Sequence, residues 1–419
     1  MCACTAGTAS AQLAYTLTLG LAHNDNVNLS ADDPIGQYIL RPGLGFSYQR
    51  TGQALDAQAI GNLQYRDYLG GDFGDSTRGQ LDAMADWHIA PQRLDWVFAD
   101  SLGVQPVNER QPDTPSNEQQ VNVFTTGPTL LLSAGGATRA RIELRYRDSY
   151  AEKSSQFNSH RVSSAGHLIH DLNSVSQVSA NIAARQVRFD HPGANSPDYE
   201  RYDIYAGYSR ALSRFNLDLA AGYTKLDLHD GADDDRGALL RAGLRWQPSD
   251  RNRFTLDWER QLTDAAETLA LQRQTLGVPP TEIALGNATV SPETFLQRRT
   301  DLSWEHTGTR FGWSLSTFLF DRDYSNAPQL DQHGHGIDGT LSWQVRPRLS
   351  LGLFGNYRKR HFDLPGSTYR DATLGGSVGY QLSQHLSWHL DLTHYRRTSN
   401  LTVGGTTQNI VYFWIAWTR

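Results

Sequence analysis

Cysteine is almost missing from this chain, and so are lysine and long apolar runs. Two of the 419 residues are cysteines, Cys2 and Cys4, so neither a disulfide nor a thiolate metal site can form in the body of the protein. The mean hydropathy is -0.52, and no stretch approaches the roughly 18 to 20 consecutive apolar residues that a membrane-spanning helix requires. The sequence therefore excludes a disulfide framework and a bundle of membrane helices.

Lysine accounts for three of the 38 basic residues, at Lys153, Lys225 and Lys359, and arginine supplies the rest. A biased genomic base composition explains part of this split. Arginine is also the better residue for a fixed, hydrogen-bonded charge on a wall. The net charge of -6 argues against a general nucleic-acid-binding protein, and no nucleic acid is expected as a partner.

What the chain has in abundance is strict alternation of polarity. In the stretch 139–147, Ala140, Ile142, Leu144 and Tyr146 alternate with four arginines and one other charged residue, a glutamate, so one face is apolar and the other charged. Segments of roughly ten residues with this period recur along the whole chain. The chain has no further segments that could cover the apolar faces of so many strands. The pattern therefore predicts an all-β, up-and-down antiparallel barrel with lipid outside and water inside.

The connections between these segments alternate between short and long. Nine short connections and ten long ones predict about twenty strands, within a range of 18 to 22. In outer-membrane barrels the short turns face the periplasm and the long loops face outward, so we expect a Gram-negative outer-membrane protein with both termini in the periplasm. The short turns fall near 50–52, 90–92, 134–136, 171–173, 212–214, 248–250, 307–309, 346–348 and 382–384. The long loops fall near 23–35, 66–78, 106–120, 148–159, 189–199, 229–236, 262–298, 322–333, 361–371 and 397–408.

The two ends of the chain have separate signatures. Residues 1–11 end in small residues that resemble a secretory cleavage site, so we expect a signal-peptide remnant or a short disordered tail there. Residues 12–419 form the single barrel domain. Strands begin at once after that site and leave no room for a preceding plug, which argues against an energised, TonB-type siderophore receptor. The aromatic stretch 409–417 predicts a closing strand of the kind that barrel-assembly machinery recognises, although Thr418 and Arg419 follow it.

The connection 262–298 is the longest and is expected to be extracellular. Its first half, 263–273, has helical propensity, and Pro279-Pro280 would end a helix. The helix could fold inward as a constriction or lie outside as a flap, and the sequence leaves both positions open.

Charged residues on the polar face of the strands are predicted to line the lumen. Arginine outnumbers the acids among them, which suggests an electropositive bore that attracts an acidic glycan through paired hydrogen bonds. The alternative is that arginine–carboxylate ladders across neighbouring strands only fill and stiffen the interior. The set comprises Arg41, Arg139, Arg141, Glu143, Arg145, Arg147, Arg185, Arg201, Asp203, Arg241, Arg245, Arg253, Asp257, Glu259, Arg299, Asp301, Glu305, Asp338, Arg346, Arg358, Arg360 and Asp391.

Four aromatic residues are also expected inside or along the loops, namely Tyr205, Phe318, Phe320 and Tyr412. Their rings could stack on sugars, or they could simply pack.

Metal binding and catalysis are not expected. His333-Gly334-His335, and His167 with His170, each lack a third ligand at a defined spacing. The loop 230–235 is rich in aspartate but lacks the order of a calcium loop, which leaves at most a weak surface calcium or lipopolysaccharide-bridging site.

Two histidines have a potential catalytic neighbour close in sequence. His160 lies near Ser159 and Ser163, and His394 lies near Asp391, but neither belongs to a nucleophile motif. We therefore predict no enzymatic activity and no cofactor.

The segment 22–29, with the sequence AHNDNVNL, resembles the opening of outer-membrane β-barrel porins encoded with exopolysaccharide or exosortase gene clusters. The resemblance implies a channel or accessory for a secreted polysaccharide, supplied by periplasmic polysaccharide-export proteins and surrounded by outer-membrane lipid and lipopolysaccharide. We therefore predict export or passage of an exopolysaccharide. A plugged structural or adhesive barrel is the alternative, and a general diffusion porin is the third.

Overall fold

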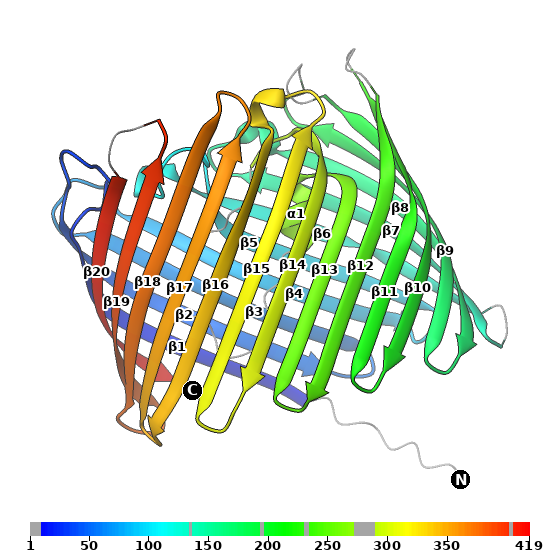
Figure 1. Ribbon diagram of the computed structural model, residues 1–419. Helices are drawn as coiled ribbons and strands as arrows, with labels where there is room; N and C mark the ends of the chain where they lie inside the picture. Colours follow the sequence, from blue (N-terminus) through cyan, green and yellow to red (C-terminus); the bar gives the residue numbers. More distant parts are fainter. Residues whose placement is uncertain (1–9, 134–135, 193–196, 230–233, 272–289, 402–404) are drawn as a thin grey trace, which may run out of the picture.

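The chain closes into one antiparallel barrel of 20 strands in a computed structural model (Figure 1). The structure describes residues 10–133, 136–192, 197–229, 234–271, 290–401 and 405–419. Every strand pairs with the next one along the chain, and β20 pairs with β1 to complete the circle. The predicted fold class and the predicted number of strands are confirmed.

The strands are longer than the roughly ten-residue apolar segments that revealed them, because only the middle of each strand carries the apolar outer face. They are β1 (Ser10–Asn24), β2 (Gln37–Thr51), β3 (Leu55–Tyr68), β4 (Ser76–Ala90), β5 (Leu94–Pro106), β6 (Glu118–Ser133), β7 (Thr138–Ala151), β8 (Ser159–Asn173), β9 (Ser176–Phe189) and β10 (Tyr199–Leu212). The second half comprises β11 (Phe215–Leu228), β12 (Asp235–Ser249), β13 (Asn252–Asp264), β14 (Thr294–Thr307), β15 (Phe311–Tyr324), β16 (Gln332–Arg346), β17 (Leu349–Phe362), β18 (Ser367–Gln381), β19 (Leu386–Ser399) and β20 (Gly405–Thr418).

Helical structure is sparse. The short helices are η1 (Pro115–Asn117), η2 (Ser155–Phe157), η3 (Pro328–Leu330) and α1 (Ala265–Leu271). Within the described ranges no helix has the length and apolar character needed to cross a bilayer.

The two faces of each strand have the predicted character. On β9 and β10, Ile182 and Ile204 are each 62% exposed on the outer face, whereas Arg201 on the inner face of β10 is 2% exposed. An apolar surface left this open to solvent over a whole barrel is stable only against lipid. Period-two alternation therefore sorts the residues between a lipid-facing and an inner surface.

Closure depends on the aromatic C-terminal segment. Residues of β20 pair with β1 from Thr16↔Thr418 to Asn24↔Ile410. The backbone N–H groups of Tyr15 and Arg419 donate to each other's carbonyl oxygens at 2.9 Å. Both ends of the described chain therefore lie at the end of the barrel that carries the short turns, called here the turn end, and the opposite end is called the loop end (Figure 1).

Candidate functional site: the barrel lumen

Helix α1 lies inside the barrel (Figure 1). Of the two positions that the sequence left open, an inward constriction and an external flap, the structure shows the inward one. Ala265, Ala266 and Leu269 pack with Val121 of β6 and Phe157 of η2 in one buried apolar cluster. The helix thus bridges from β13 to the wall formed by β5 and β6. The connection itself is confined to 265–293, because 262–264 and 294–298 belong to strands, and Pro279-Pro280 lies outside the described residues.

Asp264, the last residue of β13, holds the start of α1. Its Oδ1 accepts a hydrogen bond from the backbone N–H of Glu267 at 3.0 Å, the bond expected of a residue that caps a helix. Its Oδ2 accepts from Arg161 Nη1 at 2.6 Å and from the hydroxyl of Tyr199 at 2.6 Å. The side chains of Asp264 and Arg161 are only 2% and 3% exposed. This buried contact ties α1 to β8 and β10.

Glu267 forms the second attachment of α1. Its carboxylate accepts from Arg185 at 2.5 and 3.2 Å and from Arg201 at 2.9 Å. Arg201 also contacts Asp203 on its own strand at 3.0 Å. Arg147 lies nearby and donates to the hydroxyl of Thr125 at 3.1 Å. Arg185 and Arg201, both predicted to line the lumen, therefore hold the inward helix in place rather than facing an open bore.

A second segment, the 107–117 loop, reaches from β5 and β6 to the wall formed by β17 to β19. Glu109, in the 107–117 loop between β5 and β6, pairs with Arg360 of β17 at 3.3 Å. Arg397 of β19 donates to the backbone carbonyls of Glu109 and Arg110 at 3.3 and 3.0 Å. Asp371 of β18 accepts a hydrogen bond from Arg360 at 3.4 Å and forms an ion pair with Arg397 at the same distance. These partners are buried, so the loop is fixed to the far wall by charge-assisted hydrogen bonds.

Two neighbouring cavities inside the barrel are lined by charged residues. The larger, of about 610 Å³, is bordered by Thr268 of α1 and lined by charged residues of β11 to β14. A neighbouring cavity of about 390 Å³ reaches β16 and β17. Together they contain four arginines and five acids. These are Arg241, Arg245, Arg299 and Arg358, and Asp218, Asp257, Glu259, Asp301 and Asp338.

The cavities are therefore not electropositive overall, in contrast to the excess of arginine that strand parity suggested for the lumen as a whole. Arg299 pairs with Asp301 at 2.5 Å along β14, so this contact occupies both side chains without joining neighbouring strands. No carboxylate pairs within 4.0 Å with Arg241, Arg245 or Arg358 in the described part of the chain. Arg241 instead donates to the side-chain oxygen of Gln261 at 3.0 Å, and Arg358 lies over the ring of Phe318.

The remaining predicted lumen residues are distributed along the wall. Most of them find an acid or a ring on a neighbouring position, which favours the stiffening interpretation for this part of the set. Arg139 pairs with Asp171 at 2.5 Å, Arg141 and Arg145 with Glu143 at 2.8 and 3.3 Å, and Arg253 with Glu305 at 3.2 Å, while Arg41 lies 5.1 Å from the centroid of Tyr412.

Three of the four predicted inward aromatic residues, Phe318, Phe320 and Tyr412, have a guanidinium group over the ring. Arg299 and Arg358 lie 5.2 and 5.7 Å from the ring centroid of Phe318, which is 8% exposed. Such cation–π contacts occupy the faces that a sugar would need. Packing is therefore the better account of Phe318 and of Tyr412, which has Arg41 over its ring.

The candidate catalytic histidines meet other partners. His160 contacts Asp148 and Asp190 at 2.8 and 3.2 Å. His394 lies 2.8 Å from the side-chain oxygen of Asn409. Of the paired histidines, His167 contacts Asn181 at 2.7 Å and His170 contacts Thr138 at 2.9 Å. The aspartate-rich stretch 230–233 lies outside the described residues.

Sequence reasoning missed the acids that anchor the two inward segments. Asp264 carried a usable signal, because an aspartate directly before a helix-forming stretch is a standard start of a helix. Glu109 carried none, since its role depends on where its loop travels.

No family model matches the chain, and no curated protein matches it in sequence. Its fold is similar to that of solved outer-membrane barrels. A variant of the ferric enterobactin receptor PfeA from Pseudomonas aeruginosa aligns with a TM-score of 0.51 and 11% identity, covering 98% of this chain and 81% of that one. The siderophore receptor PirA from the same organism gives 0.46 and 13%, covering 97% and 80%. Acinetobacter baumannii OccAB3 gives 0.41 and 11%, covering 98% and 99%. At these identities the likeness shows the fold alone.

Proposed function

We propose that the protein is an outer-membrane channel for an acidic exopolysaccharide, constricted by α1 and by the 107–117 loop. The observation that carries the proposal is the pair of surfaces on the closed sheet, an exposed apolar outer face and a polar inner face around a cavity of about 610 Å³. Lipid solvates the first surface and water the second. The long loops, on this proposal, face away from the periplasm.

The cargo is inferred from the chemistry of the cavity wall. Alternating arginines and acids offer sugar hydroxyls both donors and acceptors. Arg241, Arg245 and Arg358 add guanidinium groups that can bind the carboxylates of a uronic acid. The resemblance of segment 22–29 to porins of exopolysaccharide clusters points to the same class of cargo. Many weak contacts suit passage, because conduction requires release as well as binding.

The test is conductance in planar bilayers. In one variant, Asn-Gly replaces 265–293 and joins Asp264 to Thr294, which are cross-strand partners, through a two-residue hairpin turn. We expect this variant to conduct more than the wild type. Added oligouronate should interrupt its current more often than a neutral dextran oligomer of equal length does.

Two further substitutions locate the contact. Arg241→Gln combined with Arg245→Gln should make the interruptions by oligouronate rarer. Arg348→Gln, in the turn between β16 and β17, removes one arginine charge outside the cavity and should leave the interruptions unchanged. Equal interruption by both oligomers would refute the acidic cargo, and current without interruption would indicate a general diffusion porin.

A plugged structural barrel is the second candidate, because both inward segments are held by buried ion pairs. It predicts no current in the wild type, and current only after the 265–293 replacement is combined with Glu109→Gln. An outer-membrane location implies lipopolysaccharide and the barrel-assembly machinery as partners under either candidate. Periplasmic export proteins are partners that the channel proposal adds.

A further inference from the structure

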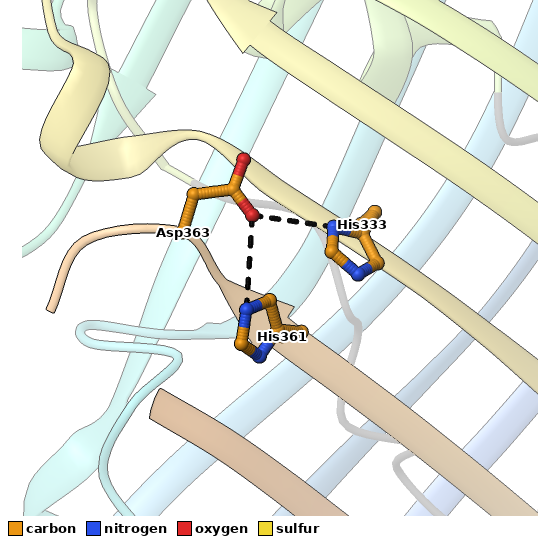
Figure 2. A group of neighbouring side chains, drawn as sticks. All are labelled: His333, His361 and Asp363. Carbon is orange, nitrogen blue, oxygen red and sulfur yellow. Dashed lines mark ion pairs between the residues drawn. The ribbon is translucent and has the colours of Figure 1, made fainter. Parts of the chain in front are cut away.

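Two histidines and an aspartate gather on the outer surface at the loop end of the barrel. His333 of β16 and His361 of β17 are direct cross-strand partners, and Asp363 follows the end of β17 (Figure 2). One ligand atom of each residue lies within 4.8 Å of the others. The sequence showed only His333 beside His335, a pair without a third ligand.

One of the distances equals the ligand spacing of a small metal site, and the others are longer. His333 Nδ1 lies 3.3 Å from Asp363 Oδ1, and His361 Nε2 lies 3.9 Å from the same oxygen. Ligand atoms at about 2.0–2.1 Å from a tetrahedral zinc ion stand roughly 3.3–3.4 Å apart. His333 and Asp363 are 57% and 50% exposed, so their side chains can rotate to bring ligand atoms that lie within 4.8 Å of one another to that spacing.

Neighbouring groups orient the ligands. The Nδ1 atom of His361 lies 2.8 Å from the hydroxyl of Thr368 on β18. If that nitrogen carries the proton, Nε2 keeps its lone pair toward Asp363, which is the usual arrangement of a metal-bound imidazole. The backbone N–H of Asp363 donates to the carbonyl oxygen of Asp331 at 3.0 Å and fixes the start of the loop.

The charges around the site favour a cation. Arg298 pairs with Asp321 and Asp323 at 2.7 and 3.0 Å and offsets one of their two negative charges. Asp363, by contrast, pairs only with the two imidazoles among the described residues. The carboxylate is therefore not already satisfied by an arginine or a lysine there.

We propose that His333, His361 and Asp363 bind a borderline divalent transition metal, zinc in particular. Two imidazoles with one carboxylate select such an ion over calcium or magnesium, which prefer oxygen ligands. The fourth position is open to the surface. On the same outer face of β16 the apolar band begins at Ile337, four residues or about 13 Å away, so the site stands clear of the lipid core.

The test is zinc titration of the full-length protein in detergent, monitored by calorimetry. Cys2→Ser and Cys4→Ser are introduced throughout so that the terminal thiols do not compete. We expect one zinc ion per chain. His333→Ala, His361→Ala and Asp363→Asn should each weaken binding by more than the about 10–100-fold that changes in supporting residues cost, and Thr368→Val should weaken it within that range.

The matched control is His335→Ala, which removes a histidine from the same outer face two residues from His333 and should leave the affinity unchanged. Thr368→Val keeps all three ligands and guards against misfolding as the cause of a loss. The proposal is overturned if the wild type fails to bind zinc at millimolar concentration, or if His333→Ala and His361→Ala bind it as tightly as the wild type. Cobalt bound with a six-coordinate absorption spectrum would equally contradict the four-coordinate site.

Discussion

Glu267→Gln should release the inward helix while leaving the barrel intact. The carboxylate of Glu267 receives three charge-assisted hydrogen bonds, at 2.5 and 3.2 Å from Arg185 and at 2.9 Å from Arg201. An amide of the same shape removes the charge that both guanidinium groups face. Arg201 keeps Asp203 as a partner at 3.0 Å, but Arg185 loses its carboxylate.

The magnitude follows from the burial of these groups, since the Glu267 side chain is only 12% exposed. Breaking one partner out of a buried ion pair costs about 3–5 kcal/mol. The lower end applies here, because Asp203 compensates Arg201. A cost of about 3 kcal/mol corresponds to roughly a hundredfold rise in the population of the undocked helix.

Single-channel recording measures this population directly as the open probability. Glu305→Gln is the matched control, because it makes the same chemical change in the Arg253–Glu305 pair, whose side chains are 57% and 50% exposed. An exposed pair contributes about 0–1 kcal/mol, so this variant should behave like the wild type.

A second variant separates loss of the charge pair from general damage. Glu267→Gln combined with Arg185→Gln leaves no unpaired guanidinium at that position, so the double variant should open less often than Glu267→Gln alone. The reasoning is refuted if Glu267→Gln and Glu305→Gln have the same open probability as the wild type.

Three further outcomes are expected. Burial raises the pKa of Glu293, next to the start of β14, to about 7. Between about pH 4.5 and 7 the folded protein holds a proton that the unfolded chain has released, so docking of the chain around Glu293 should weaken as pH rises through that range. Proteolysis of this part of the chain should show this dependence, and Glu293→Gln should abolish it. Ile204→Arg, on the lipid face near mid-strand, should destabilise the barrel in lipid by about 2–4 kcal/mol, while the inward Tyr205→Arg should cost less; equal losses in urea titrations would contradict the assigned faces. Glu109→Gln should speed trypsin cleavage at Arg110 about tenfold or more, because the loop loses its ion pair with the far wall, and an unchanged rate would show that the pair does not hold it.

The architecture could be predicted from local sequence because the polar and apolar faces of a strand can be recognised from a few consecutive residues. On β7, Ile142 and Leu144 alternate with Glu143 and Arg145, and this period of two fixes which side meets lipid. Turn residues between such segments set the number of strands. The aromatic segment of β20 showed where the sheet closes, and the pairing of Tyr15 with Arg419 agrees with it.

The contents of the lumen could not be predicted in the same way. Parity placed Arg185 and Arg360 inside the barrel but gave no indication of what they meet. Arg185 pairs with Glu267, 82 residues away, and Arg360 with Glu109, 251 residues away. Those contacts depend on the path of two loops across the interior, and no local period encodes that path.

The same distinction applies to the outer rim. The sequence by itself predicted the two strands now seen as β16 and β17, but it put His333 and His361 in the loops 322–333 and 361–371, whereas both residues lie within the strands. Only the register of one strand against the other brings the two imidazoles face to face, since a slip of one residue would turn either of them to the opposite side of the sheet. Alternation is a property of one strand, whereas pairing is a property of the closed barrel.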